Sequence, residues 1–158
     1  MFCSVDNNFL SGIRNKKISL CKKGYMDLPS WDEIFYDLDL SLKKDYLILK
    51  FNGFGITTHS AEEHLPCCDF FLEKMKFLFP KKKGSAHIYT SLTTKNYGLG
   101  KHADDVDVLF WQVKGKTLWI FNEQEKELEP GDVLYIPKAV SHQVISLTPR
   151  VGISFGFR

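Results

Sequence analysis

The second half of the chain, after Gly84, alternates between short apolar runs and turn-forming residues. The runs are rich in β-branched and aromatic residues, and many of them alternate with period two, which is typical of strands. We predict seven strands in this half and an eighth at residues 45–52. The seven are residues 86–91, 106–113, 117–121, 127–129, 133–136, 142–147 and 151–157.

Turn residues separate these strands. The Lys114-Gly115 pair predicts a tight hairpin between two of them, and Pro130-Gly131-Asp132 predicts a turn between two more. About eight short strands are the number that a closed jelly-roll or cupin barrel requires. The predicted fold is therefore mostly β with N-terminal helices, in the form of a double-stranded β-helix.

The N-terminal half carries two helix signals. Ser30 predicts the N-cap of a helix over residues 31–38. Ser60, followed three residues later by Glu63, has the pattern of a capping box and predicts a second helix that reaches about Phe79. Apolar residues recur on one face of that helix at spacings of three and four. They are Leu65, Cys68, Leu72, Met75 and Phe79.

The length and the periodicities predict one domain over residues 1–158. Within it, residues 1–84 are expected to form a helical and mixed region that packs on the barrel. Residues 85–158 are expected to form the barrel core with its functional site. Hydrophobic residues make up 44% of the chain and 13 residues are Phe, so a core can form without disulfides.

Charge and cysteine content indicate which partners and which cellular compartment to expect. The formal net charge of +2 gives no strong nucleic-acid signal, and no apolar run approaches the roughly 20 residues of a membrane span. Residues 1–30 lack the pattern of a secretion signal. The four cysteines form no disulfide framework and are interpreted as free thiols in a reducing compartment. A cytoplasmic location is predicted. The cysteines are Cys3, Cys21, Cys67 and Cys68.

Three residues have the chemistry of a metal site. His102 and Asp104 are two apart at the entry to a predicted strand, so both side chains are expected on one face. His142 stands at the start of another predicted strand. Two imidazoles and one carboxylate form the facial triad that non-haem Fe(II) oxygenases use, because this set leaves coordination positions open. His64 is predicted on an exposed helix face, and His87 on the same strand face as Tyr89.

Two segments resemble a known family. Residues 102–119 read HADDVDVLFWQVKGKTLW, and residues 130–142 read PGDVLYIPKAVSH. Both are similar to the cupin-like JmjC oxygenases, in particular the ribosomal-protein hydroxylases, and the resemblance extends over about residues 86–157. It implies an Fe(II)- and 2-oxoglutarate-dependent hydroxylase that acts on a protein or peptide side chain or on a small molecule. Its metal ligands and catalytic residues would be His102, Asp104 and His142.

The resemblance also implies a cosubstrate pocket. Tyr89 and Ser154 match residues that line the 2-oxoglutarate site in the family. The family usually places Lys or Arg where this chain has Thr117, and a hydroxyl gives a weaker, neutral hydrogen bond to a carboxylate. Thr117 is nevertheless the matching cosubstrate position. Cations elsewhere in the chain that could replace the missing one are Lys101, Arg150 and Arg158.

The missing cation leaves two other functions open. The first is a metal-dependent cupin dioxygenase that uses oxygen without 2-oxoglutarate. The second is a non-enzymatic cupin that binds a small ligand. Exposed edge strands also leave a homodimer open. Near the site, Asp105 and Asp107 are interpreted as loop or surface charges. Trp111 stands at an odd position and Asp104 at an even one, so strand alternation predicts that Trp111 lies outside the barrel lumen. Trp119 is predicted to be a core residue.

Overall fold

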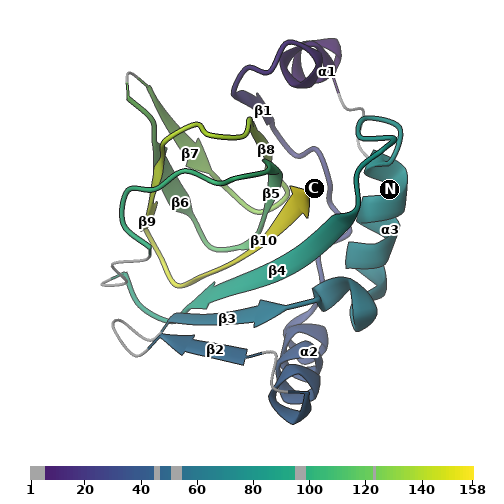
Figure 1. The fold of residues 1–158 in the computed structure, drawn as a ribbon. Coiled ribbons are helices and arrows are strands. Elements are labelled where there is room, and N and C mark those ends of the chain that lie inside the picture. Colours follow the sequence, from purple (N-terminus) through teal and green to yellow (C-terminus); the bar gives the residue numbers. More distant parts are fainter. Residues whose placement is uncertain (1–5, 45–46, 51–54, 95–98, 123) are drawn as a thin grey trace.

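A computed structural model describes residues 6–44, 47–50, 55–94, 99–122 and 124–158. Two antiparallel sheets face each other, and three helices lie outside the larger sheet (Figure 1). The helices are α1 (Asn7–Arg14), α2 (Trp31–Lys43) and α3 (Pro66–Met75), with a 3-10 turn η1 (Ala61–Glu63) before α3. The strands are β1 (Ser19–Cys21), β2 (Leu47–Lys50), β3 (Gly55–His59), β4 (Gly84–Ser91), β5 (Asp107–Lys114), β6 (Thr117–Ile120), β7 (Glu125–Leu128), β8 (Val133–Ile136), β9 (Gln143–Ser146) and β10 (Arg150–Phe157).

The chain crosses repeatedly between the two sheets. The larger sheet has the order β1-β8-β5-β10-β4-β3-β2, and the smaller has the order β7-β6-β9. The turns from β5 to β6, from β7 to β8 and from β9 to β10 therefore each lead from one sheet to the other. This winding is the double-stranded β-helix of a cupin or jelly roll, so the predicted fold class is confirmed.

The predicted hairpin at Lys114-Gly115 is wrong, because β5 and β6 belong to different sheets. Gly115 has φ +65°, and a Cβ atom there would lie 1.9 Å from the carbonyl oxygen of Pro149. The turn therefore needs glycine both for its left-handed backbone and for its close approach to the β9–β10 connection. A true hairpin joins β6 to β7 in the smaller sheet.

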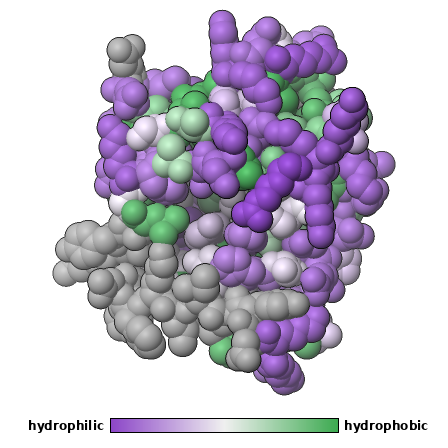
Figure 2. All heavy atoms as spheres, in the orientation of Figure 1, coloured by the Kyte–Doolittle hydropathy of each residue, from purple (hydrophilic) through white to green (hydrophobic). Residues whose placement is uncertain are grey.

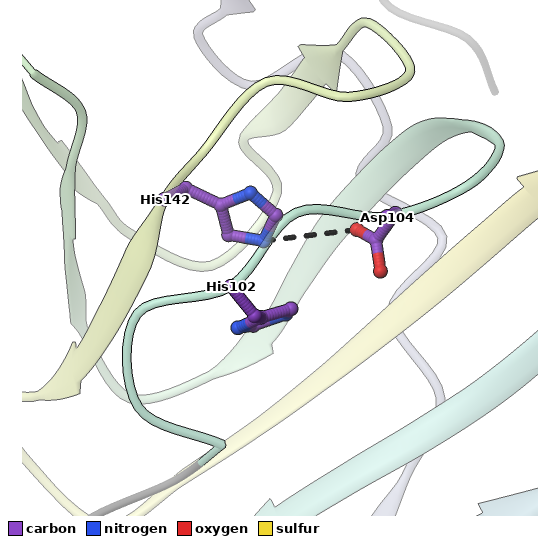
Figure 3. Close-up of side chains that lie close together, drawn as sticks. All are labelled: His102, Asp104 and His142. Carbon is purple, nitrogen blue, oxygen red and sulfur yellow. Dashed lines mark ion pairs between the residues drawn. The ribbon is translucent and has the colours of Figure 1, made fainter.

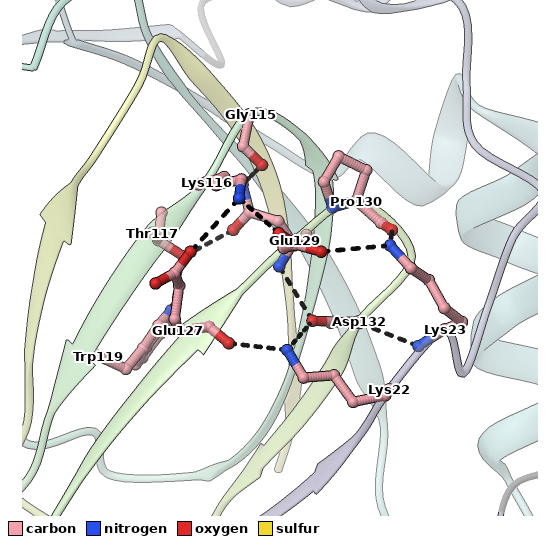
Figure 4. Close-up of polar contacts among 11 residues, drawn as sticks. Lys22, Lys23, Gly115, Lys116, Thr117, Trp119, Glu127, Glu129, Pro130 and Asp132 are labelled. Carbon is pink, nitrogen blue, oxygen red and sulfur yellow. Dashed lines mark hydrogen bonds and ion pairs between the residues drawn. The ribbon is translucent and has the colours of Figure 1, made fainter.

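Buried Asp132 ties the Pro-Gly-Asp turn to the N-terminal segment (Figure 4). Its carboxylate accepts hydrogen bonds from the backbone N–H groups of Lys23 and Glu129, at 2.9 and 3.0 Å, and from Nζ of Lys22 at 2.7 Å. Gly131, with φ +94°, lets the chain turn sharply before it. These bonds hold β1 beside β8, with which it pairs from Ser19↔Tyr135 to Cys21↔Val133.

The N-terminal half contributes strands as well as helices. The sequence pattern did not predict β1, β3 or α1. β2 lies within the predicted strand at residues 45–52, whose other residues are outside the described part of the chain. β3 pairs with β4 and with β2, so the larger sheet extends past the barrel on one side. The seven strands predicted after Gly84 are present as β4 to β10, with small shifts at their ends.

One helix start is confirmed and the other is wrong. Ser30 caps α2 with a complete capping box, in which Glu33 reaches back to the backbone N–H of Ser30. Ser60 makes no capping bond and has φ +58°. The chain instead forms η1 and begins α3 at Pro66, which needs no donor at a first helical position. The apolar face predicted for this segment is nevertheless buried.

The main core lies between the larger sheet and the helices. Phe71 of α3 stacks on Phe155 of β10, with ring centroids 4.2 Å apart, and packs parallel to Trp111 of β5 at 6.1 Å. The indole N–H of Trp111 donates to the carbonyl of Tyr25 at 3.0 Å. Trp111 therefore lies outside the lumen, as predicted. A second apolar cluster fills part of the lumen between the sheets and includes Phe110 and Trp119.

The outer surface is mostly polar. Hydrophilic side chains cover most of the described surface seen in Figure 2, with small apolar patches between them. None of the helices in the described ranges is both long and apolar enough to cross a membrane. Cys67 and Cys68 are free thiols, Cys21 is buried, and Cys3 lies outside the described residues.

Candidate metal centre and its cavity

A cavity of about 760 Å³, measured out to its open mouth, lies between the two sheets. The larger sheet lines it through β3, β4, β5 and β10, and the smaller sheet through β6 and β9. Aromatic and aliphatic groups such as Phe110, Trp119 and Val144 supply apolar walls. Polar and charged side chains, among them Tyr89, Asp104 and Arg150, stand between these apolar walls, as in most ligand-binding cavities.

The three predicted ligand residues come together on the wall of this cavity (Figure 3). His102 and His142 form an isolated antiparallel bridge, in which each backbone N–H donates to the other residue's carbonyl at 2.9 and 2.7 Å. Asp104 follows on the loop into β5, and its Oδ2 lies 3.7 Å from Nε2 of His142. One ligand atom from each residue lies within 4.8 Å of the others. The arrangement could hold a metal ion.

Backbone carbonyls set the orientation of both imidazoles. Nδ1 of His102 lies 3.0 Å from the carbonyl of Gly100, and Nδ1 of His142 lies 3.0 Å from the carbonyl of Val140. A carbonyl only accepts hydrogen bonds, so Nδ1 carries the proton in each ring and Nε2 keeps its lone pair. Such partners behind metal-binding imidazoles orient the rings and raise their basicity as ligands.

The loop that carries Asp104 is fixed to the segment before His142. The backbone N–H of Ala139 donates to the carbonyl of Asp104 at 2.9 Å. Ala139 has φ +63°, a left-handed conformation that costs a non-glycine residue about 1 kcal/mol. The strained turn at residues 137–140 therefore ties the loop of Asp104 to the segment that leads into His142.

Burial keeps His142 neutral. Its residue is 2% exposed, and its ring packs against Trp119 and Phe121 with centroids 5.3 and 6.3 Å away. Desolvation lowers the pKa of His142 below its usual value, and the neighbouring His102 adds to this effect. A neutral imidazole is the form that binds a metal, so the site is ready for one at neutral pH.

Tyr89 and Ser154 also line the cavity. Tyr89 on β4 lies opposite Gly152 of β10, two positions before Ser154, so both side chains face the lumen. A Cβ atom on Gly152 would lie 2.1 Å from the ring of Phe110, so the glycine makes room for that ring. Burial and the nearby Asp104 raise the pKa of Tyr89, which stays a neutral hydroxyl donor. The roles of Tyr89 and Ser154 in binding a cosubstrate stay predictions.

Thr117 is not among the residues that line the cavity. Its hydroxyl donates to Oε1 of Gln112 at 2.7 Å and accepts from the indole N–H of Trp119 at 3.1 Å. Figure 4 shows Thr117 near the Gly115 turn, with Trp119 farther along β6. A hydroxyl has one proton to donate, and Gln112 already accepts it. The structure therefore gives no support to Thr117 as a ligand of a cosubstrate carboxylate.

Arg150 was one of three cations that the sequence offered in place of the Lys or Arg that the family has at position 117. It is buried and lines the same cavity as Tyr89 and Ser154. Lys101 and Arg158 are exposed. The sequence did contain a signal for Arg150. Residues 150, 152 and 154 alternate along a strand and so fall on the same face, which places Arg150 beside Ser154.

Two predictions about neighbouring polar residues are wrong. The side chain of His64 is buried beside that of Asp37, and its Nδ1 lies 3.2 Å from Oδ1 of that carboxylate. Asp107 is 2% exposed and is bound by Lys16 and Lys82. Asp105 is exposed, as predicted.

His87, on the same strand as Tyr89, is not among the lining residues. It packs on His59, with ring centroids 4.3 Å apart. Burial, followed by the nearby His59, lowers the pKa of His87 to about 4. His87 is therefore neutral and belongs to a contact between β3 and β4.

Comparison with known proteins agrees with this geometry. Residues 120–158 match the JmjC domain family. This part of the chain holds the last residue of β6 and all of β7 to β10, with His142, Arg150 and Ser154. The matched family is the one that the sequence motifs indicated.

One curated protein and several solved structures are similar to this chain. The ribosomal protein uL16 3-hydroxylase of Escherichia coli is 30% identical over 90 residues, which cover 43% of this chain and 24% of the relative. A structure of the E. coli ribosomal oxygenase YcfD, in complex with cobalt and 2-oxoglutarate, superposes with a TM-score of 0.77 at 20% identity, covering 96% of this chain and 51% of that one. Another structure of E. coli YcfD gives 0.78 at 18% identity, covering 100% and 55%. The chain thus spans about half the length of these structures.

Proposed function

We propose that this protein is an Fe(II)- and 2-oxoglutarate-dependent oxygenase that hydroxylates a protein or peptide side chain, or a small molecule. The observation that carries the proposal is the meeting of His102, Asp104 and His142 on the wall of one cavity, with their ligand atoms within 4.8 Å of one another. Two imidazoles and one carboxylate on one side of a metal leave positions free for oxygen and a bidentate cosubstrate.

The donor set fits Fe(II). Neutral imidazole and carboxylate are ligands that this ion accepts, and both imidazoles present Nε2 because their Nδ1–H groups are held by carbonyls. A bound Fe(II) would supply the one-electron and oxygen chemistry that no side chain can. Asp104 would offset part of the ion's charge. Trp119 and Phe121 would keep water from one side of His142.

The relatives support the cosubstrate and the substrate class. YcfD is described in complex with cobalt and 2-oxoglutarate, and also with succinic acid. The curated relative is named for the 3-hydroxylation of ribosomal protein uL16, which favours a protein side chain over a small molecule as substrate. A ribosomal substrate also favours the predicted cytoplasmic location. The homodimer stays a prediction.

The test is 2-oxoglutarate turnover by the Fe(II)-loaded protein, followed as succinate formation with and without uL16. We expect Asp104→Ala to reduce turnover more than about 100-fold, since the loss of even an outer-shell partner typically costs about 10- to 100-fold. Asp105→Ala is the matched control, because it removes the adjacent but exposed carboxylate. It should leave turnover unchanged. An Asp104→Ala variant with full turnover would refute the proposal.

The same assay separates the alternatives. Oxygen uptake that needs Fe(II) but not 2-oxoglutarate would indicate a cupin dioxygenase. A protein that binds neither Fe(II) nor Mn(II) would indicate a non-enzymatic cupin. A mass increase of one oxygen atom on uL16 would fix the substrate as protein, and turnover without that increase would direct the search to other substrates.

A further inference from the structure

Arg150 presents an unpaired buried cation to the cavity. It is the first residue of β10 and only 7% exposed. Its Nε donates to the hydroxyl of Ser146 at 3.0 Å, and its Nη1 is buried without a hydrogen-bond partner. Among the ion pairs of the described residues, none includes Arg150.

A buried charge without a counterion is unfavourable and is rarely retained unless it binds something. Burial lowers the pKa of Arg150 to about 10, so the guanidinium is still protonated at neutral pH. The neighbouring Tyr89 is a neutral phenol with a raised pKa and does not compensate the charge. The missing partner is therefore an anion that enters the cavity from solution.

The position of the guanidinium identifies which anion it suits. Ser146, which holds Nε of Arg150, is the strand partner of Thr117 across β6 and β9. The cation thus lies beside the position at which the JmjC-like motif would place Lys or Arg. Residues 150, 152 and 154 share the lumen face of β10, so Arg150 and Ser154 lie on either side of Gly152.

We propose that Arg150 binds the distal carboxylate of the cosubstrate, and that this chain has moved the carboxylate-binding cation from β6 to β10. The inference rests on the proposed function, in which the 2-oxo acid end of 2-oxoglutarate faces the metal. A guanidinium can bind a carboxylate through two parallel N–H bonds, and Ser146 accepts only from Nε of Arg150, which leaves the N–H groups of the two Nη atoms for this contact. Ser146 positions the guanidinium, and Thr117 takes no part.

The test compares two ligands on the Mn(II)-loaded protein by titration calorimetry. 2-Oxopentanoate keeps the 2-oxo acid end of 2-oxoglutarate but has a methyl group in place of the distal carboxylate. We expect Arg150→Gln to weaken 2-oxoglutarate binding about 10- to 100-fold and to change 2-oxopentanoate binding by less than about threefold. An equal loss for both ligands would mean a general distortion of the cavity and would overturn the assignment.

Three further variants sharpen the result. Arg158→Gln removes an exposed arginine and should leave both affinities unchanged. Thr117→Val should also preserve 2-oxoglutarate binding, whereas a loss as large as that of Arg150→Gln would return the role to Thr117. The exchange Arg150→Thr with Thr117→Arg restores a cation on the other strand. Recovery of 2-oxoglutarate binding in that double variant would show that one carboxylate subsite is served from either position.

The outcomes separate this inference from the proposed function. If the wild-type protein binds Mn(II) but shows no 2-oxoglutarate binding, the proposed function fails. If the wild-type protein binds 2-oxoglutarate and Arg150→Gln binds it equally well, only the role of Arg150 fails. Mn(II) affinity and the thermal melting curve of each variant check that it is folded. Arg150→Lys, which keeps the charge, is the second variant if Arg150→Gln does not fold, and it should bind 2-oxoglutarate more weakly than wild type but more tightly than Arg150→Thr.

Discussion

At each of the two cavity imidazoles, one backbone carbonyl decides which nitrogen faces the cavity. The carbonyls of Gly100 and Val140 accept from Nδ1 of His102 and His142, so the ligand geometry is set by the main chain before any metal arrives. This matters because a metal site with preset tautomers needs no reorganisation when the ion binds.

The lowered pKa of His142 predicts how metal binding depends on pH. The residue loses its proton more easily than an ordinary histidine, so its ligating form persists into mild acid. We expect Mn(II) affinity to be nearly constant from about pH 8 to about pH 6.5, the usual histidine value, and to fall at lower pH as protons compete.

The measurement is Mn(II) titration at several pH values, read by the paramagnetic resonance signal of the free ion. His87→Ala is the control, since His87 packs on His59 and does not line the cavity. Its profile should overlay that of the wild type. An NMR titration of the metal-free protein that gives the His142 imidazole a pKa above the usual histidine value of about 6.5 would contradict the assignment of a depressed pKa to His142.

At the scale of elements, Asp107 connects the segments that follow α1 and α3 to the barrel. Its carboxylate accepts from Nζ of Lys16, after α1, at 2.8 Å and from Nζ of Lys82, after α3, at 2.6 Å. The hydroxyl of Tyr135 and the backbone N–H of Lys138 also donate to it. Burial alone would raise the pKa of Asp107, but these donors lower it well below its usual range.

Asp107→Asn should therefore lower the free energy of unfolding by about 2 kcal/mol at neutral pH. Because the folded-state pKa is depressed, the stabilisation is present above the usual carboxyl value of about 4 and is lost as the pH falls below it. The gap between wild type and variant should shrink at about pH 3. Urea unfolding at the two pH values measures it.

Asp39→Asn is the matched control for this test, because Asp39 pairs with Lys43 at 2.7 Å on an exposed face of α2. Exposed pairs of this kind contribute about 0.3–0.5 kcal/mol. Asp39→Asn should therefore lower the free energy of unfolding much less than Asp107→Asn, although the ion-pair distances are similar. Equal effects for the two variants would mean that burial does not strengthen the Asp107 contacts.

The turn between β5 and β6 gives a second prediction at this scale. Gly115 and Gly100 both have positive φ, at +65° and +72°, but only Gly115 lacks room for a Cβ atom. We expect Gly100→Ala to destabilise the fold by about 1 kcal/mol from backbone strain alone, and Gly115→Ala by about 3 kcal/mol or more because the Pro149 carbonyl must move as well. Thermal unfolding of both variants tests this, and equal losses would contradict it.

For the whole molecule, the sequence predicted what depends on local pattern and missed what depends on distant partners. Strands β4 to β10 and the cap at Ser30 follow from periodicity and turn chemistry, and the three residues that meet on the cavity wall were grouped by type and spacing. Asp107 was misplaced because its partners Lys16 and Lys82 lie far away in sequence. Arg150 stayed one candidate among several because its burial becomes visible only once β9 and β10 are in place.

The position of β10 in the larger sheet has a consequence for folding. β10 follows every other strand in the chain, yet it lies in the middle of that sheet, paired with β5 on one side and β4 on the other. Until β10 is inserted, β4 and β5 have unpaired edges that face each other across a gap. Contacts of such long sequence separation slow folding to about milliseconds or longer. Arg150 and Ser154 both lie on β10, so a nascent chain cannot complete this wall of the cavity until β10 has been synthesised.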